Sequence, residues 1–401
     1  MTPQVTLVVP GRWHAFDFAR ELQCLGALHR IITNYPKSRT RRWGIPDDKV
    51  VSLPLTLLLT KAAWKLGGER FATRHNFRIN NLFARAAAEK LGNPDVVHGW
   101  SGTAEPSIIK ARDRGIVTVL ERSSSHMLEQ CRILREEYAS LGLRWEETPP
   151  ATVDGELREY ELVNQVFVPS LFVERSFLAR KFPARRLFRN GFGVDLTRFK
   201  PGRKPDDIFR VIYAGALSIR KGVHHLANAF RAAGIPRSEL LLVGGASPET
   251  DRLIGEDTTG IRRVGHLPQT ELPRLYQTGS VFAMASLEEG QAYVQAQALA
   301  CGLPLVCTTN TGGEDFLLMS GAGVARGAGV IEYPAGYLVP AGDPAAMAMA
   351  LRALARDPAL LHAKQTAAAH LAERDLSWAR YAEANLGAYR RLLMESSISE
   401  S

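Results

Sequence analysis

Cysteine is scarce in this sequence: the 401 residues include only Cys24, Cys131, Cys301 and Cys307. None of them forms a CxxC pair, and most lie in apolar surroundings. Disulfide frameworks are typical of small secreted domains, so we expect reduced, buried thiols in a cytoplasmic protein. The chain runs directly into an apolar strand at Val5–Val9, without a basic and then apolar leader, which predicts no secretion signal.

Long hydrophobic runs are also lacking, because no apolar segment reaches the roughly 20 residues that cross a bilayer. A hydrophobic content of 45% with 23% charged residues is typical of a globular protein, and the length predicts two domains. The net charge of +9 favours an anionic partner. The aromatic residues do not interleave with the basic ones, so we predict phosphates or lipid headgroups and no nucleic acid.

Several catalytic motifs are absent as well. The sequence contains no GxxxxGK[ST], GxSxG or HExxH motif, and the GxG pairs at 191–193 and 321–323 lack a third glycine. The histidines show no zinc-binding spacing. These absences argue against nucleophilic, zinc-dependent and GxGxxG-type dinucleotide chemistry.

The sequence does show a regular alternation of strand and helix patterns in both halves. This rhythm predicts an α/β protein with doubly wound parallel sheets, whose ligands bind beyond the carboxyl ends of the strands. The predicted strands are Val5–Val9, 30–34, 95–97, 117–120, 166–168, 211–214, 240–243, 262–264 and Val281–Met284.

The most informative stretch is 286–304, an acidic loop followed by an Ala-rich helix from about Ala292. Free amides at the start of such a helix favour an anionic ligand. Glu289 and Gln297 are eight residues apart, or about 12 Å of helical rise. That span suits a nucleotide-sugar, which has hydroxyls at both ends and a diphosphate in the middle. The alternative is an ordinary helix with a chance acidic cap.

A second loop, 215–222, joins the strand 211–214 to a helix at Val223–Ala233. Arg220 and Lys221 stand at the start of this helix, where each cation opposes the macrodipole at a cost of about 0.3–1 kcal/mol. The placement is poor for stability but suits a diphosphate clamp. The alternative is a solvated basic turn.

These motifs resemble those of retaining, family-4 glycosyltransferases of GT-B architecture (glycosyl transferases group 1), in the bacterial polysaccharide-type subgroup. The family's Glu-x7-Glu signature falls on Glu289 and Gln297, and its phosphate-binding Lys falls on Lys221. Three departures are Gln297 in place of Glu, Ala216 in place of an Arg, and Gly-Gln-Ala at 290–292 in place of Gly-Phe-Gly. We expect Arg220 to supply the charge that Ala216 lacks. Further matches lie at 190–201, 264–268 and 311–314.

The resemblance implies two Rossmann-like domains that face a central cleft. We expect an acceptor-binding domain at 1–195, a nucleotide-sugar-binding domain at 196–376, and a final helix at 377–394 that packs back on the first domain. It implies a hexosyltransferase-type enzyme that needs no cofactor and no metal. The donor would be bound by Gly215, Ser218, Arg220, Lys221, Gly244, Leu267, Glu289, Gly290, Gln291, Ala292 and Gln297.

The predicted acceptor side and reacting centre lie in the first half. Relatives often carry a histidine where this chain has Glu121, with His126 nearby, so we predict Glu289, Lys221, Arg220, Glu121 and His126 as catalytic. Capping of the next helix plus a surface ion pair would also explain 121–126. The acceptor-side candidates are Gly11, Arg12, His14, His98 and Arg122, where Gly11 could equally form a tight turn and His98 could be structural.

The predicted function is sugar transfer, with retention, from a nucleotide-diphosphate-sugar to a glycan or lipid-linked acceptor. We expect a role in surface polysaccharide (exopolysaccharide, capsule or lipopolysaccharide) synthesis. Alternatives are a catalytically idle paralogue that scaffolds polysaccharide assembly, and a GT-B nucleotide-sugar epimerase.

We also expect peripheral contact with the inner face of an anionic membrane, through an apolar segment at 53–59 and nearby tryptophans. A packed helix with snorkelling basic side chains explains the same pattern. The basic residues are Arg39, Arg41, Arg42, Lys61, Lys65, Arg70, Arg74 and Arg78.

Overall fold

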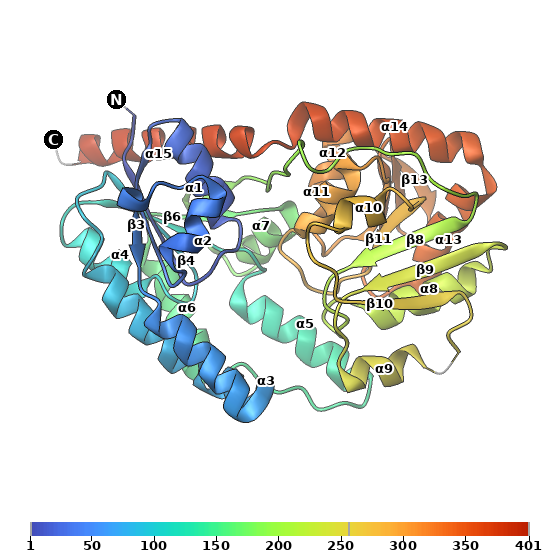
Figure 1. The fold of residues 1–401 in the computed structure, drawn as a ribbon, viewed down its shortest axis with the longest axis horizontal. Coiled ribbons are helices and arrows are strands. Elements are labelled where there is room, and N and C mark those ends of the chain that lie inside the picture. The colour runs from blue at the N-terminus through green and yellow to red at the C-terminus, as the bar shows by residue number, and fades with distance from the viewer. Residues whose placement is uncertain (1, 256, 400–401) are drawn as a thin grey trace.

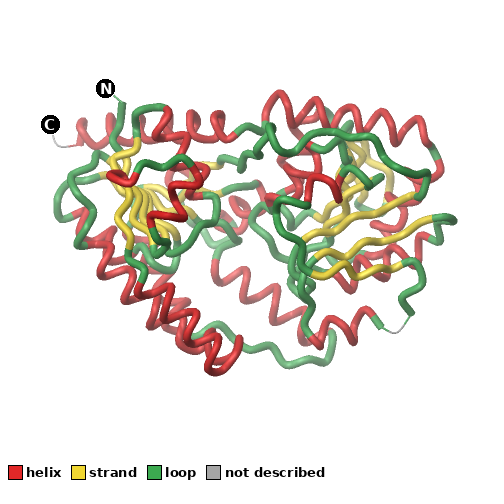
Figure 2. Tube along the Cα trace, viewed as in Figure 1, coloured by secondary structure: helices red, strands yellow, loops and turns green. Residues whose placement is uncertain are grey.

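Two lobes, each with a sheet covered by helices, make up the chain (Figures 1 and 2). The computed structural model describes residues 2–255 and 257–399, apart from the side chains of 69, 70, 72–74, 398 and 399, which include those of Arg70 and Arg74. The predicted fold class, α/β with two Rossmann-like parallel-sheet domains, is confirmed.

The first sheet is entirely parallel, with the strand order β3-β2-β1-β4-β5-β6-β7. Its strands β1 and β5 are fully buried and mostly apolar, as expected for a parallel sheet that is covered on both faces. Its strands are β1 (Val5–Val9), β2 (Leu28–Thr33), β3 (Val50–Ser52), β4 (Val96–Trp100), β5 (Val117–Glu121), β6 (Gln165–Val168) and β7 (Leu187–Arg189).

Helices connect these strands and cover both faces. The region for which the sequence allowed a packed helix with snorkelling basic side chains is helical: it forms α3, a long helix kinked at Gly67 and Gly68 whose length and kink the pattern did not predict. The α-helices of this lobe are α1 (Ala15–Cys24), α2 (Lys37–Thr40), α3 (Leu55–Ala88), α4 (Glu105–Arg112), α5 (Met127–Ser140), α6 (Pro150–Leu162) and α7 (Leu171–Leu178); the 3-10 turns are η1 (Arg41–Trp43), η2 (Asp47–Lys49) and η3 (Ala184–Arg186).

The second sheet has the order β10-β9-β8-β11-β12-β15-β14-β13. Its first six strands are parallel, and β14 and β13 extend it as an antiparallel hairpin that the sequence analysis did not predict. The strands are β8 (Phe209–Ala214), β9 (Ser238–Val243), β10 (Ile261–Gly265), β11 (Val281–Met284), β12 (Leu305–Thr308), β13 (Val324–Gly327), β14 (Val330–Tyr333) and β15 (Gly336–Val339).

The final helix of the chain returns to the first lobe (Figure 1). Trp378, Tyr381 and Tyr389 of this helix pack in the same hydrophobic cluster as Phe16 and Phe18 of α1. The helix runs to Ser399, beyond the predicted end at 394. The helices that follow β8 are α8 (Val223–Ala233), α9 (Pro248–Ile254), α10 (Leu272–Tyr276), α11 (Tyr293–Ala300), α12 (Gly313–Ser320), α13 (Pro344–Arg356), α14 (Pro358–Asp375) and α15 (Trp378–Ser399).

Each sheet has a switch point, where strand order reverses and a crevice opens at the carboxyl ends. In the first sheet the reversal lies between β1 and β4, so the loops after these strands border the crevice. In the second it lies between β8 and β11, which brings the loops 215–222 and 285–292 together. Both candidate loops of the second half therefore stand at one switch point.

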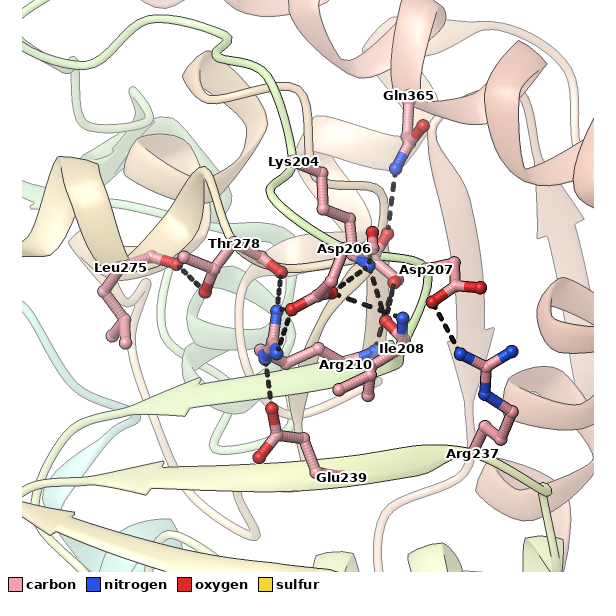
Figure 3. A network of polar contacts seen from close by, with 11 residues as sticks. Lys204, Asp206, Asp207, Ile208, Arg210, Arg237, Glu239, Leu275, Thr278 and Gln365 are labelled. Carbon is pink, nitrogen blue, oxygen red and sulfur yellow. Dashed lines mark hydrogen bonds and ion pairs between the residues drawn. The ribbon is translucent and has the colours of Figure 1, made fainter.

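The segment 190–208, between β7 and β8, is the linker between the two lobes. A polar network fixes it to the start of the second sheet (Figure 3). Arg210 of β8 binds Asp206 of the linker at 2.9 Å and donates to the Thr278 carbonyl at 2.5 Å. Lys204 donates to the Ile208 carbonyl at 2.6 Å, and Arg237 binds Asp207. The predicted domain boundary at 195/196 falls in the segment between β7 and β8 that leads into this network.

The four cysteines are all free, as predicted. Burial is confirmed for Cys131, Cys301 and Cys307 but is wrong for Cys24, which lies exposed at the last position of α1. Among the described residues, no helix has the length and apolar character needed to cross a membrane.

Candidate functional site

The two loops at the second switch point are in direct contact. Gly222 precedes α8 with φ of +60°, and an added Cβ atom would lie only 2.0 Å from the carbonyl oxygen of Ala285. Both the left-handed backbone and the close approach require glycine at this position. The contact sets the start of α8 against the loop that carries Glu288 and Glu289.

Two basic residues and two acidic residues pair across this contact. Arg220 Nη1 lies 2.9 Å from Glu288 Oε2, and Lys221 Nζ lies directly against Glu289 Oε2. Arg220 Nη2 also approaches Glu289 Oε2 at 3.9 Å. Lys221 and Glu289, which the sequence predicts to serve the same ligand, are therefore brought together.

Burial strongly affects the charges of this cluster. Burial, together with the charge of Arg220, lowers the pKa of Lys221, while Glu288 acts in the opposite direction. Burial would raise the pKa of Glu288, but Arg220 and two hydrogen bonds from Ser125 outweigh it and hold this pKa below its usual value. Each cation thus has an acidic partner that an anionic ligand could replace.

The acidic loop also contacts the first lobe. Ser125 donates to Glu288 Oε1 from its backbone N at 2.9 Å and from Oγ at 2.8 Å. An added Cβ at Gly290 would lie 1.8 Å from the Ser123 carbonyl, and Ser170 Oγ donates to the Gly290 carbonyl at 2.6 Å. Gly290 is therefore a point of contact between the lobes.

A cavity of about 590 Å³ is lined by residues of both lobes. Gln297 lines it, and the Oε1 atom of Gln297 is buried without a hydrogen-bond partner among the described residues. Arg198 also lines the cavity, and its Nη2 atom is likewise buried without a hydrogen-bond partner among the described residues. The lining includes Arg12, Trp13, His14, Asp17, Arg20, Arg42, Trp43, Gly193, Val194, Asp195, Arg198, Gln269, Tyr293, Gln297 and Trp378, but neither Lys221 nor Glu289.

A buried polar cluster reaches the cavity through His14 and Tyr293. Glu121 at the end of β5 lies 3.5 Å from His14 Nε2 and 3.3 Å from His98 Nε2. Burial would raise the pKa of Glu121, but the two histidines lower it to about 2. His14 Nδ1 lies 2.6 Å from the hydroxyl of Tyr293 on α11, so the cluster connects the two lobes.

His126 and Arg122 do not join this cluster. The His126 ring accepts from Leu128 N at 3.3 Å as the N-cap of α5, and it packs against Tyr160 and Phe177. Burial and nearby arginines lower its pKa to about 4. Arg122 is buried in an ion pair with Glu156 at 2.5 Å. The sequence groups Glu121 with His126, whereas the structure places His126 in a separate cluster.

Other predicted donor residues lie around the same loops. An added Cβ at Gly244 would lie 1.8 Å from the Gly215 carbonyl, so the loops after β8 and β9 are also in contact. The Ser218 carbonyl accepts from Lys221 N at 3.1 Å. Leu267, after β10, packs against a core cluster, and Ala292 is the buried residue before α11.

Gln291 is directed to the segment between β7 and β8. Its Oε1 accepts from Phe192 N at 2.6 Å, and its Nε2 donates to the Gly312 carbonyl at 3.3 Å. It also lines a larger cavity of about 910 Å³ beside this segment, and no other predicted site residue is among the described lining residues. The Gln291 amide is therefore bound by protein groups, and the larger cavity lies away from the paired charges.

The structure places the predicted acceptor-side residues Arg12, Gly11 and His98 in different surroundings. Arg12 lines the 590 Å³ cavity, and its Nη2 donates across the lobes to Gln269 Oε1 at 3.1 Å. The Gly11 carbonyl accepts from Thr33 Oγ1 at 3.3 Å, in a buried turn. His98 is fully buried and is bound to Tyr389 Oη through Nδ1 at 2.6 Å.

Sequence reasoning missed Glu288, Ser125 and Tyr293. The acidic pair Glu288-Glu289 mirrors the basic pair Arg220-Lys221, and this complementarity was a signal available in the sequence. The contacts of Ser125 and Tyr293 depend on how the lobes pack, which no local pattern reveals.

Comparison with known proteins identifies part of the chain. Residues 208–357 match the family model described as glycosyl transferases group 1. D-inositol 3-phosphate glycosyltransferase 1 of Catenulispora acidiphila is 28% identical over 345 residues, which cover 78% of this chain and 76% of that protein. Glycogen synthase of Mycobacterium tuberculosis is 29% identical over 51% of this chain and 47% of its own length. Apart from the first of these, the chain spans about half or less of the curated relatives that it matches.

Solved structures resemble the whole chain. Sucrose-phosphate synthase from Thermosynechococcus elongatus superposes with a TM-score of 0.70 at 19% identity, over 98% of this chain and 100% of that chain. Anabaena HepE in complex with UDP and glucose gives a TM-score of 0.66 at 14% identity, over 97% and 100%. The chain therefore has a GT-B fold with a glycosyl transferases group 1 domain in its second lobe, and it is a glycosyltransferase enzyme.

Proposed function

We propose that this enzyme transfers a sugar, with retention of anomeric configuration, from a nucleoside diphosphate sugar to a glycan or lipid-linked acceptor during surface polysaccharide synthesis. The observation that carries the proposal is the set of facing charge pairs, Arg220–Glu288 and Lys221–Glu289, at the switch point of the second sheet. The two cations and the start of α8 suit a diphosphate. The carboxylate of Glu289 beside them suits sugar hydroxyls.

Each part of the donor would then meet one part of the site. Lys221, Arg220 and the first amides of α8 would bind the diphosphate in place of the acidic side chains. Glu289, released from Lys221, would accept hydrogen bonds from the sugar. Gln297, whose buried Oε1 has no partner in the described structure, would accept from a ribose hydroxyl. UDP bound to Anabaena HepE supports a nucleotide donor.

Catalysis would depend on the leaving diphosphate. Cations and helix amides can neutralise the charge that develops on it, so the transfer needs no metal and no other cofactor. Its oxygen would take the proton of the attacking acceptor hydroxyl on the same face of the sugar. This scheme requires few protein bases, which agrees with the burial of Glu121 and with the hydrogen bond that His14 Nδ1 makes to the Tyr293 hydroxyl.

A phosphorylated acceptor is favoured by a specific observation. Four arginines line the 590 Å³ cavity, and the buried Nη2 of Arg198 lacks a hydrogen-bond partner among the described residues. Guanidinium groups bind phosphate through paired hydrogen bonds. The acceptor named for the Catenulispora relative is also a phosphorylated polyol. A phosphate on the acceptor would accordingly bind near Arg12 and Arg198.

The proposed location is the cytoplasm, with peripheral contact at the inner face of the membrane. Leu58, Trp64 and Leu66 of α3 are exposed by 60%, 57% and 81%, and Lys61 and Lys65 stand between them. Apolar side chains with interspersed cations suit an anionic lipid surface. This contact would bring a lipid-linked acceptor to the first lobe.

The test is a panel of nucleotide-sugars, first for thermal stabilisation and then for turnover. A transferase forms a glycosylated acceptor and slowly releases nucleotide without one. A catalytically idle paralogue would be stabilised but would release no nucleotide. A nucleotide-sugar epimerase would change the sugar in the absence of any acceptor. Lack of stabilisation by every donor would contradict the proposed donor site.

A further inference from the structure

Three side chains with metal-binding atoms converge where α5 of the first lobe meets α8 of the second. Glu137 Oε1 lies 2.8 Å from His224 Nε2 and 2.9 Å from His225 Nε2. The donor atoms all lie within 4.8 Å of one another, and this is the one such group of three found among the described residues. Sequence reasoning did not predict this cluster, because Glu137 is far from the histidines along the chain.

The three side chains of this cluster are more buried than those of an ordinary surface ion pair. The side chains of His224, Glu137 and His225 are exposed by only 4%, 14% and 18%. Burial would raise the pKa of Glu137, but the hydrogen bonds from both histidines lower it to about 2, so the carboxylate is ionised at neutral pH. Two imidazoles therefore face a fixed negative charge in a largely dry location.

We propose that Glu137, His224 and His225 form a Zn²⁺ site that joins the two lobes. Two histidines, one carboxylate and a water molecule are a common zinc-binding set, whereas Mg²⁺ and Ca²⁺ prefer oxygen ligands. Bonds of about 2.0–2.2 Å in tetrahedral geometry separate the ligand atoms by roughly 3.3 Å. The carboxylate would therefore move about 0.5 Å from the imidazoles to admit the ion.

The two histidines can bind Zn²⁺ without any change in the total number of protons on their rings. Without metal, each Nε2 donates its proton to Glu137; with metal, each Nε2 gives its lone pair to Zn²⁺ and the ring proton moves to Nδ1 through solvent exchange. His224 Nδ1 has no hydrogen-bond partner among the described residues, so only the bond to Glu137, which the metal would replace, holds that ring in its Nε2–H tautomer.

Because its ligands come from both lobes, the proposed Zn²⁺ site would affect how far apart the lobes lie. His224 follows Lys221 by three residues at the start of α8, while Glu137 belongs to the first lobe (Figure 1). An ion held by both helices would fix the separation of the lobes next to the paired charges of the proposed donor site. Zn²⁺ would therefore stabilise the protein without any nucleotide-sugar.

The experiment uses the full chain, purified without a histidine tag and treated with a chelator. Zn²⁺ is added alone, and binding is measured by calorimetry, by metal analysis after gel filtration and by thermal shift. We expect one Zn²⁺ per chain and a rise in Tm of roughly 3 °C or more at a hundredfold excess over Kd. No donor or acceptor is present, so the result is independent of the proposed transferase function.

Two variants test the proposed metal ligands, one from each lobe. Glu137→Gln keeps the side-chain shape, and His225→Ala removes a half-buried ring; each should weaken Zn²⁺ binding more than about tenfold. His362→Ala, an exposed histidine on α14, is the matched control and should bind as the wild type does. Circular dichroism verifies that each variant is folded. Absence of binding, equal affinity for Mg²⁺, or unchanged binding by either site variant would overturn the proposal.

Discussion

Replacing Lys221 by alanine tests the proposed donor site most directly. Lys221 is nearly buried, with 12% of its side chain exposed, and its ammonium lies against Glu289. In the proposed complex it would exchange this carboxylate for a diphosphate oxygen. The substitution removes that exchange and leaves Arg220 as the remaining cation of the pair.

The expected magnitude follows from this exchange of partners. Two unit charges about 4 Å apart attract by about 4 kcal/mol at an effective dielectric constant of 20. Part of this attraction is already present with Glu289, so the net gain is closer to a charge-assisted hydrogen bond, about 2–3 kcal/mol. We therefore expect a loss of about 30- to 150-fold in nucleoside diphosphate affinity and at least as much in kcat/KM.

The assay compares ligands that differ only in phosphate. Calorimetry would measure a nucleoside diphosphate and the corresponding nucleoside against the wild type and Lys221→Ala. Lys200→Ala is the control, because Lys200 is an exposed residue of the linker and its loss changes the net charge equally. Lys221→Ala should lose affinity for the nucleoside diphosphate but not for the nucleoside. Lys200→Ala should bind both ligands as the wild type does.

Equal diphosphate affinity in Lys221→Ala and the wild type would refute the reasoning. A similar penalty for the nucleoside would also refute it, because the effect would then come from a distorted loop. Circular dichroism and denaturation curves separate that outcome from global unfolding.

The remaining predictions address other parts of the cleft. Glu289→Gln should keep diphosphate affinity but lower kcat/KM for the sugar donor by roughly tenfold or more, measured by steady-state kinetics; loss of diphosphate affinity instead would contradict its role. The pKa of Glu121 falls from 4.5 to about 2, which is worth about 3 kcal/mol of stability that is present above pH 4.5 and is lost as the pH falls towards 2. Glu121→Gln should therefore lower the free energy of unfolding at pH 7 by about this amount, with a smaller difference at pH 3 in urea titrations; a constant difference would be inconsistent with this origin. Arg198→Ala should raise the KM for a phosphorylated acceptor about tenfold without changing donor affinity, whereas an unchanged KM would exclude Arg198 from the acceptor site. Trp64→Glu should weaken co-sedimentation with anionic vesicles, and equal binding would exclude this part of α3 from membrane contact.

The parts of the site that were predictable depend on local patterns. Apolar runs predicted β8 and β11, and parallel strands direct their following loops to one edge of a sheet. Arg220 and Lys221 were therefore expected to lie near Glu289 without knowledge of the packing. The charge contacts at the start of α8 agree with this expectation.

The parts that were not predictable depend on how the lobes meet. Ser125 binds Glu288 over a separation of 163 residues, and no period or spacing encodes that contact. His126 follows Glu121 closely in sequence, yet the turn after β5 directs it into the first-lobe core. Proximity along the chain was a poor guide here, because a strand end reverses the direction of successive side chains within a few residues.

Glu288 connects donor binding to the arrangement of the lobes. One of its oxygens binds Arg220 of the second lobe, and the other accepts both hydrogen bonds from Ser125 of the first lobe. A diphosphate that attracts Arg220 removes the counter-charge from a fully buried carboxylate, which is costly unless another donor replaces it. Ser125 is already in place, so its hydrogen bonds become more important as Arg220 turns to the ligand. Donor binding should therefore strengthen the contact between the lobes, because the carboxylate that loses its cation depends more on the first lobe.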